Sequence, residues 1–473
     1  MDTLSPIKTL LEIFQKQLGK DAVIDHAQAL LVYECDGFTI AKGNTGAVIF
    51  PSSTSQIAQC IKKLTQAQIE IVPRGSGTGL TGGCVAFDGG VLISTTRMNQ
   101  IKSIDLPNRM ARVQAGVINA SLSDAVAQSA LRFSPDPSSQ KASTIGGNAA
   151  TNAGGINTLK YGVTTNHILG VEYVLSDGQV VRSGAQGLFD HEAIDLTRLI
   201  VGSEGTLGLI TEIWCRLTPR PRHFRTVFAV FKSSVDACQT VSDITAQGIL
   251  PTSMEMLDGN VIQVVEETFH LGFPHDAQAM LLIEIDGVQG VLDEQLACVV
   301  ALCKQNNATR VIPKKTESER QALWAARKKA FGALGKITRS YCTQDACIPR
   351  SKLPQALVAF STIAEPYGKK ISNIFHAGDG NVHPIIMFDE DDPEDVQAVM
   401  HLSHEILDYC LSIGGTITGE HGVGVEKIEM MPRMFNEDTM ALFQEIKNVF
   451  DVSRTINEGK LIPSDKINIS LIN

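Results

Sequence analysis

Short runs of apolar and β-branched residues alternate with glycine-rich turns between residues 41 and 217 of the chain. Such runs, when bounded by turn signals, are typical of buried strands. We expect strands at 47–50, 69–72, 91–94, 111–113, 171–175 and 209–214. Apolar residues at helical spacing predict helices between some of them, at 55–68 and 120–128. This part of the chain therefore has the pattern of an α+β domain with connections dominated by glycine.

The pattern changes at residues 218–225, where Pro219 and Pro221 interrupt regular structure among several arginines. Beyond this boundary, strand and helix patterns follow one another. Strands are expected at 226–231, 251–258 and 280–287, and helices at 234–248, 261–268, 293–305, 318–334, 396–413 and 438–450. The alternation predicts an antiparallel sheet with helices on one face.

Charge and hydropathy narrow the class of protein. The 473 residues include 41 basic and 51 acidic side chains, and a formal charge of −10 argues against a general binder of nucleic acid or of anionic membranes. No apolar run approaches the roughly 18 residues of a membrane span, so no transmembrane segment is expected. The first twenty residues predict an amphipathic helix and not a signal peptide, with an apolar stripe at Leu4, Ile7, Leu10, Leu11, Phe14 and Leu18.

The ten cysteines contain no C-x-x-C pair and match no iron–sulfur spacing. Scattered reduced thiols are typical of a cytosolic chain, and we expect a cytoplasmic protein, with peripheral association with the inner membrane left open. Any redox centre must then be an organic cofactor, a metal held mainly by histidine and carboxylate, or both.

Three glycine-rich segments lie in the first half, at 73–83, 135–155 and 202–208. Gly77, Gly79 and Gly82 formally satisfy the G-x-G-x-x-G spacing, but the residues that follow lack the helix of a dinucleotide-binding βαβ unit, and we reject that interpretation. Backbone amides in such loops can still converge on a diphosphate, because no Cβ obstructs them. Together the three loops predict a long ligand lying along backbone amides.

A cluster of metal-ligand residues lies in the second half. Residues 376–383 read HAGDGNVH, and residues 415–424 read GTITGEHGVG. A Gly-Asp-Gly turn lets the chain reverse between His376 and His383, and Glu420 completes a set of two histidines and one carboxylate. This set is compatible with zinc, manganese or iron. On these residues alone, a metallohydrolase without flavin remains an alternative.

The motifs PRGSGTGLTGG, PDPSSQ…STIGGNAATNAGG, KYG and GSEGTLG resemble the FAD-binding domain of the vanillyl-alcohol oxidase/p-cresol methylhydroxylase (PCMH) flavoproteins. Within that superfamily the chain is similar, from residue 33 to residue 460, to the FAD-linked 2-hydroxyacid oxidases and dehydrogenases that act on glycolate, D-lactate or D-2-hydroxyglutarate. The resemblance implies an α+β, two-domain PCMH-type FAD-binding fold with an antiparallel-sheet substrate (cap) domain. We expect an FAD-binding domain at 1–221, a substrate domain with the metal site at 222–425, and a C-terminal segment at 426–473 that returns to the FAD domain.

The resemblance also implies the FAD-binding residues. The diphosphate would lie against Pro73, Arg74, Gly75, Ser76, Gly77, Thr78, Gly79 and Gly82. The isoalloxazine and ribityl region would be lined by Pro135, Asp136, Ser138, Thr144, Gly147, Asn148 and Asn152, and the adenosine part by Glu204, Gly205 and Ile210. Asn457 resembles a C-terminal flavin contact, although Glu458 stands where proline is usual. Thr78 occupies the place of a histidine that binds flavin covalently in some relatives, so non-covalent FAD is implied.

For the chemistry, the resemblance implies a divalent metal, zinc before manganese or iron, on His376, His383 and Glu420. His421 would take the hydroxyl proton of a 2-hydroxy acid, and Arg327 would bind its carboxylate. Relatives that act on dicarboxylates add a lysine near residues 341–345, and its absence here favours D-lactate or glycolate. D-2-hydroxyglutarate dehydrogenase and a non-catalytic FAD-binding subunit of an oxidase complex remain alternatives. Electrons would leave to a quinone, a cytochrome or a partner subunit, in a homodimer or a hetero-oligomer.

Overall fold

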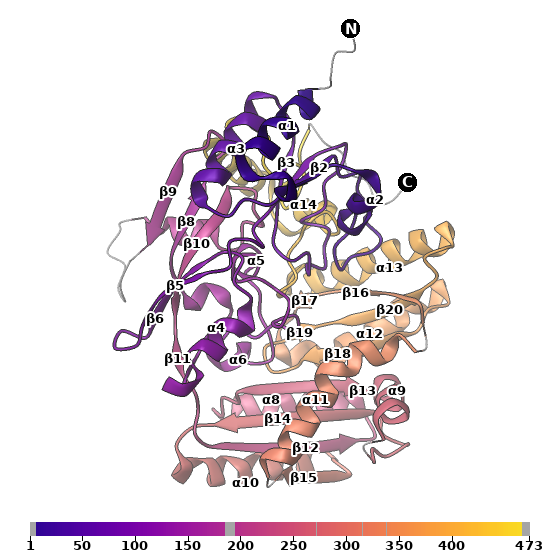
Figure 1. Cartoon of the computed structure of the whole chain (residues 1–473). Helices are drawn as coiled ribbons and strands as arrows, with labels where there is room; N and C mark the ends of the chain where they lie inside the picture. Colours follow the sequence, from indigo (N-terminus) through magenta and orange to yellow (C-terminus); the bar gives the residue numbers. More distant parts are fainter. Residues whose placement is uncertain (1–5, 185–193, 271, 315, 337, 466–473) are drawn as a thin grey trace. The chain divides into compact units, whose positions relative to one another are not determined.

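The computed structural model of the chain describes residues 6–184, 194–270, 272–314, 316–336 and 338–465 (Figure 1). The chain folds into two compact units of mixed helix and sheet. The first unit contains the described parts of Met1–Ala153, Val163–Arg220 and His421–Leu471. The second unit contains the described parts of Gly154–Gly162 and Pro221–Glu420.

The first unit is built on two main sheets. One has the order β1-β2-β4-β3, with β2, β4 and β3 parallel, and the other is antiparallel with the order β5-β6-β10-β8-β9. Its strands are β1 Val23–Ile24, β2 Ala47–Ile49, β3 Ile71–Arg74, β4 Val91–Ser94, β5 Ile101–Asp105, β6 Met110–Gln114, β7 Leu131–Arg132, β8 Ile168–Val174, β9 Val180–Gly184, β10 Leu209–Arg216 and β11 Thr218–Pro219. Its helices are α1 Pro6–Leu18, α2 Ala27–Leu30, α3 Thr54–Gln66, α4 Asn119–Ala125, α5 Ile145–Thr151, α7 Leu196–Ile200, α14 Met431–Met434 and α15 Glu437–Phe450.

The predicted N-terminal helix is α1, and the described part of its apolar stripe packs within its own unit; Leu4 lies outside the described residues. Leu11 and Phe14 are buried in a cluster with residues of α3 and of the parallel sheet, among them Ile57 and Ile93. The far end of the chain joins the same sheet, because Ile456 forms a parallel bridge with Ile71 of β3. The described parts of both chain ends therefore contribute to one core.

The second unit contains an antiparallel sheet whose main order is β15-β12-β14-β13-β18-β19-β17, with β20 paired to both β18 and β16. Its strands are β12 Phe224–Phe231, β13 Ser253–Asp258, β14 Ala279–Asp286, β15 Arg310–Lys314, β16 Ser340–Thr343, β17 Ala346–Cys347, β18 Ile371–His376, β19 Asn381–Val382 and β20 Pro384–Phe388. Its helices are α6 Thr158–Tyr161, α8 Ser234–Ala246, α9 Gly259–Phe269, α10 Gln289–Gln305, α11 Glu317–Leu334, α12 Leu353–Ala364 and α13 Pro393–Ser412.

The expectation that helices cover one face of this sheet is wrong. Leu257 of β13 packs in a cluster with Val261 of α9 and Ala330 of α11, whereas the neighbouring Met256 contacts Cys238 of α8, with 3.6 Å between the two sulfur atoms. Successive residues of a strand point to opposite faces, so helices lie on both faces. The antiparallel pairing itself agrees with the prediction.

A short segment of the second unit interrupts the sequence of the first. Gly154–Gly162 carries α6, and its Tyr161 hydroxyl donates to Asp286 Oδ2 of β14 at 2.9 Å. Lys160 pairs with the same carboxylate. The side chain of Asp286 is almost fully buried, so both donors are held at a desolvated carboxylate. Among the described residues, no helix is both long and apolar enough to cross a membrane.

Candidate functional site

The first glycine-rich loop follows β3 and contains no helix. This confirms the prediction that the loop does not open the helix of a dinucleotide-binding βαβ unit. The loop closes over Arg74, which is 6% exposed and donates from Nη1 to the carbonyl of Cys84 and from Nη2 to that of Cys35, both at 2.9 Å. Gly77 has φ of +71°, and a Cβ there would lie 2.3 Å from Arg74 Nη2. A side chain at Gly77 would therefore strain the backbone and displace the Arg74 guanidinium.

Backbone amides of this loop remain available to a ligand. Within the described part of the chain, the N–H groups of residues 76–81 donate no hydrogen bond. The loop carbonyls are used instead: Gly79 accepts from the N–H of Gly37 at 2.7 Å, and Thr81 accepts from that of Val425 at 2.9 Å. Free donors without a Cβ around them form a concavity suited to an anion. The loop therefore fits a diphosphate.

The second loop contains a helix that the sequence did not predict. Thr144 caps α5 by accepting from the N–H of Gly147 at 3.1 Å. Asn148 Oδ1 accepts from Asn119 Nδ2 at 2.9 Å, and Asn152, with φ of 52°, accepts from the N–H of Thr165 at 2.9 Å. The structure therefore brings Thr144, Asn148 and Asn152 together on one short helix, where all three side chains make hydrogen bonds within the protein.

Two buried side chains join the third loop to residues 423–424 and to the C-terminal segment. The Glu204 carboxylate accepts from the N–H groups of Val423 at 2.7 Å and Gly424 at 2.8 Å, and burial raises its pKa against the effect of these bonds. Asn457 Nδ2 donates to the carbonyls of Gly83 at 3.0 Å and Glu204 at 2.8 Å. Asn457 therefore links the first and third loops, and its amide donors are already used.

Other residues that were predicted to bind FAD differ in their burial and in their packing. Gly205, with φ of +73°, lies against Pro73, since a Cβ there would meet the proline ring at 3.1 Å. Ile210 is buried in the hydrophobic core, so any contact it makes with a ligand would involve its main chain. Pro135 is buried, whereas Ser138 is exposed. None of these four side chains carries a charge.

The two histidines of the second unit lie at the two ends of a hairpin. His376 ends β18 and pairs across the hairpin with Asn381, and His383 lies between β19 and β20. Gly380 makes the turn with φ of +78°, and a Cβ there would lie 2.2 Å from the carbonyl oxygen of Ile348. Both histidines are buried, and their rings stand edge to face with centroids 5.2 Å apart. The predicted reversal thus brings them together.

Glu420 completes the group. Its Oε1 lies 3.0 Å from His376 Nε2 and 3.4 Å from His383 Nε2, and the candidate ligand atoms of the three residues lie within 4.8 Å of one another. The backbone around Glu420 is held by Asp345, whose Oδ2 accepts from the N–H groups of Gly419 at 2.9 Å and Glu420 at 3.1 Å. One nitrogen from each histidine and a carboxylate oxygen form a donor set suited to zinc.

A further carboxylate, Glu255 on β13, contacts the group of His376, His383 and Glu420. Glu255 is the cross-strand partner of His376. Glu255 Oε1 lies 2.8 Å from His376 Nδ1. Burial alone would lower the pKa of His376, but the carboxylates of Glu255 and Glu420 raise it well above its usual value. Burial would likewise raise the pKa of Glu420, yet His376 and His383 hold it well below its usual range. His376 and the two carboxylates therefore favour each other's charged forms.

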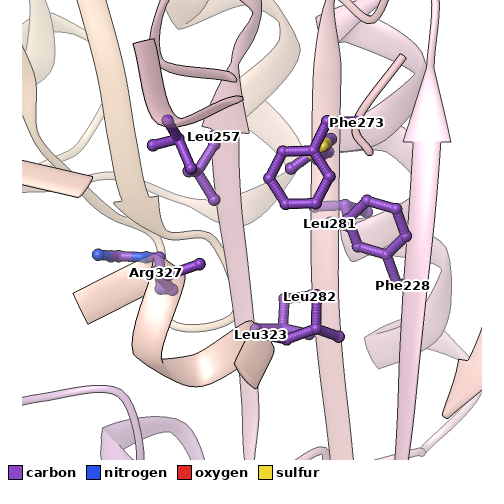
Figure 2. A pocket seen from close by; sticks show the side chains of 10 residues that line it. Phe228, Leu257, Phe273, Leu281, Leu282, Leu323 and Arg327 are labelled. Carbon is purple, nitrogen blue, oxygen red and sulfur yellow. The ribbon is translucent and has the colours of Figure 1, made fainter. Parts of the chain in front are cut away.

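Arg327 lies on the buried face of α11 and is 3% exposed. Its Nη2 is 2.5 Å from Glu255 Oε2, while its Nε has no hydrogen-bond acceptor among the described residues. In Figure 2 the aliphatic stem of Arg327 lines an apolar cavity near Phe228 and Phe273, and the guanidinium points away from it. That cavity has a volume of about 20 Å³, room for little more than one water molecule, so it is not a substrate site.

The sequence predictions missed Glu255 and Asp345. A signal existed for Glu255, because it is the one charged residue between apolar neighbours within the strand pattern Ser253–Asp258. Asp345 lies between β16 and β17 without such a signal. His421, predicted as the base, follows Glu420 directly and is the first residue of the C-terminal part of the first unit.

Comparison with known proteins adds two family matches. Residues 45–184 match an FAD binding domain, and residues 220–461 match the C-terminal domain of FAD linked oxidases. The glycolate oxidase subunit GlcD of Escherichia coli (strain K12) is 40% identical over 437 residues, covering 92% of this chain and 87% of the relative. The D-lactate dehydrogenase of Archaeoglobus fulgidus is 30% identical over 418 residues, covering 88% of this chain and 91% of the relative.

A solved structure shows the same fold. The structure of p-cresol methylhydroxylase with substrate bound has a TM-score of 0.82 and covers 99% of each chain at 16% sequence identity. At this identity the likeness concerns the fold alone. The expected PCMH-type FAD-binding fold is therefore confirmed.

Proposed function

Because the chain belongs to the family of FAD-linked oxidases, we propose that it is an FAD-dependent dehydrogenase that oxidises a small D-2-hydroxy acid, D-lactate or glycolate, to the 2-oxo acid. One observation carries the proposal: a chain with matched FAD-family segments also brings together His376, His383 and Glu420. A metallohydrolase would need only that group, and a non-catalytic FAD-binding subunit would need only the loops. The names of the two relatives, a glycolate oxidase subunit and a D-lactate dehydrogenase, support the substrate class.

The first unit would hold FAD without a covalent bond. The free amides of residues 76–81 would bind the diphosphate, and Thr78 offers no imidazole for covalent attachment to the flavin. When bound, FAD supplies the acceptor for the hydride that leaves the substrate carbon. The loops themselves would orient the cofactor through backbone donors and would take no part in the bond changes.

The second unit would hold the metal and the substrate. His376, His383 and Glu420 would bind a divalent ion, zinc before manganese or iron, because two imidazoles and one carboxylate leave coordination positions open. Such an ion lowers the pKa of a bound hydroxyl group. Both histidines are buried and Glu420 is partly buried, so the protein side of the ion would be largely shielded from water.

Proton transfer and substrate binding would fall to two further residues. An imidazole near neutral pH suits the removal of the hydroxyl proton, and His421, next to Glu420 in the chain, would accept it. Arg327 would bind the substrate carboxylate through the Nε edge of its guanidinium, which has no protein acceptor among the described residues. The segment 341–345 carries no lysine for a second carboxylate, which supports a monocarboxylate substrate.

Electrons must then leave the reduced flavin. Because the cysteines match no iron–sulfur spacing, we propose a quinone, a cytochrome or a partner subunit as the acceptor. A membrane quinone would bring the protein to the surface of the inner membrane.

Anaerobic reduction of the purified protein tests the proposal. The protein is expected to be yellow, and its flavin absorption should bleach on addition of D-lactate or glycolate, and less with D-2-hydroxyglutarate. Colourless protein that cannot be reconstituted with FAD would exclude the flavoenzyme. Yellow protein that none of the three acids bleaches would favour the non-catalytic subunit.

The base is tested by a single substitution. His421→Ala should keep its FAD and its metal but lose flavin reduction by at least about 100-fold, as expected for loss of a general base. His401→Ala, on the exposed side of α13, is the matched control and should reduce flavin at the wild-type rate. A normal rate in His421→Ala would remove His421 from this role.

A further inference from the structure

Glu255 is a buried charge flanked by apolar residues on β13. Its side chain is 1% exposed, and its neighbours on β13 are Met254 and Met256. Burying a carboxylate is costly unless charged or polar partners compensate it, and removing one member of a buried ion pair leaves the other charge uncompensated. The burial of Glu255 therefore directs attention to the groups that it contacts.

Each oxygen of Glu255 contacts a different functional residue. Oε1 lies 2.8 Å from His376 Nδ1, and Oε2 lies 2.5 Å from Arg327 Nη2. The first contact follows from strand pairing, because Glu255 and His376 are register partners on β13 and β18. The second comes from α11, whose buried face carries Arg327. One carboxylate thus connects two elements that contribute to the site.

The contact with His376 determines which ring nitrogen faces the candidate metal position. If Nδ1 donates to Glu255, the lone pair of His376 lies on Nε2, which is the nitrogen 3.0 Å from Glu420 Oε1. Histidines that bind metals usually donate their other ring N–H to a carboxylate or a carbonyl, and this fixes the tautomer and the ring orientation. The arrangement around His376 has this form.

The contact with Arg327 restricts the orientation of its guanidinium group. With Nη2 held by Glu255, rotation of the guanidinium is restricted, and its Nε is left without an acceptor among the described residues. A planar guanidinium binds carboxylates best when its orientation is fixed. Glu255 therefore contacts both a candidate metal ligand and the cation that would bind substrate.

We propose that Glu255 is a positioning residue that orients His376 for the metal and Arg327 for the substrate carboxylate. The inference rests on the proposed function, since it needs both a metal and a carboxylate substrate. Glu255 touches neither the metal position nor the substrate in this scheme. It acts through its two partners.

Glu284 provides a matched control within the same sheet. Glu284 lies on β14, is 3% exposed, and accepts from Nε of Arg320, another arginine of α11, at 2.6 Å. It also accepts from Trp324 Nε1 at 2.8 Å. It contacts none of the candidate metal ligands in the contacts of the described residues. Glu284→Gln thus reports the general cost of neutralising a buried, arginine-paired carboxylate.

The test compares Glu255→Gln with Glu284→Gln in the FAD-loaded protein. Affinity for Zn²⁺ alone is measured by competition with a chelator, and flavin reduction by D-lactate or glycolate is measured at saturating Zn²⁺. Glu255→Gln is expected to lower Zn²⁺ affinity about 10- to 100-fold. It should also raise the substrate concentration for half-maximal reduction, with a smaller change in the maximal rate. Glu284→Gln should leave Zn²⁺ affinity and half-saturation near the wild-type values.

The outcomes separate this inference from the proposed function. Wild-type protein that binds no Zn²⁺, Mn²⁺ or Fe²⁺ would overturn the metal centre, and this inference with it. Metal binding that is equal in the wild type and in Glu255→Gln, or lowered equally in both variants, would overturn the positioning role alone. If Glu255→Gln does not fold, Glu255→Asp replaces it, because the shorter side chain keeps the charge but withdraws it from His376. Unchanged Zn²⁺ affinity in Glu255→Asp would contradict the proposal.

Discussion

The candidate ligand sites of the two units are built from different groups, backbone amides in the first unit and charged side chains in the second. In the first unit, the loop of residues 76–81 presents backbone amides, and the buried Arg74 that precedes it donates to backbone carbonyls. In the second unit, buried side chains carry the charge, and Glu255 lies between His376 and Arg327. An added side chain should therefore be harmful in the first unit, and a removed side chain in the second. The predictions below test this difference.

The largest effect is expected from His383→Ala in the second unit. Loss of one of three candidate ligands should lower the metal bound per chain by at least about tenfold and flavin reduction by more, because the substrate hydroxyl loses its activating ion. FAD content should not change. Elemental analysis and flavin absorbance measure the two quantities. Unchanged metal stoichiometry, relative to the exposed His401→Ala, would contradict the ligand assignment.

A smaller effect is expected from Gly77→Ala in the first unit. The new Cβ would meet Arg74 Nη2 at 2.3 Å and would occupy a backbone conformation with φ of +71°. Affinity of the apoprotein for FAD, measured by fluorescence titration, should fall by about tenfold or more, since about 1–2 kcal/mol of backbone strain adds to the clash. Metal content should remain as in the wild type.

Gly89→Ala is the control for this substitution. Gly89 has φ of +80°, but a Cβ there would meet no atom within 4 Å, so the variant has the strain without the clash. Equal losses of FAD affinity in the two variants would show that the loop over Arg74 has no special role.

The smallest effect is expected from Thr144→Ala, compared with Ser53→Ala. Thr144 caps α5 and Ser53 caps α3, and each accepts one backbone N–H. Both substitutions should lower the free energy of unfolding by about 1 kcal/mol, as measured by urea denaturation. Only Thr144→Ala should also weaken FAD binding, by a few-fold, because α5 lies in the second glycine-rich loop. Loss of FAD affinity in both variants would remove α5 from the cofactor site.

Local sequence patterns predicted the features that depend on residues close to one another in the sequence. His376 and His383 could be paired because they lie seven positions apart with a glycine turn between them. Glu255 could not be paired with His376, because 121 residues separate them and only the β13–β18 pairing brings them together. The guanidinium contact of Arg327 depends likewise on how α11 packs.

Two fold features escaped prediction for related reasons. Helix α5 has seven residues, two of them glycine, and no apolar periodicity that spans several turns. The helices on both faces of the second sheet were missed because β13 is buried along its whole length, which hides the alternation that would distinguish its faces. In both cases tertiary contacts outweigh the local signal.

The excursion of Gly154–Gly162 into the second unit has a consequence for how the protein can be divided. The backbone passes from one unit to the other after Ala153, Gly162, Arg220 and Glu420. After a single proteolytic cut near residue 220, residues 421–471 would still pack with the N-terminal fragment, and residues 154–162 would still pack with the C-terminal fragment. Truncation at that point would remove Asn457 from the loops that it ties together, and a fragment that begins at Pro221 would lack the partners of Asp286. Neither unit can be produced from one continuous stretch of the gene.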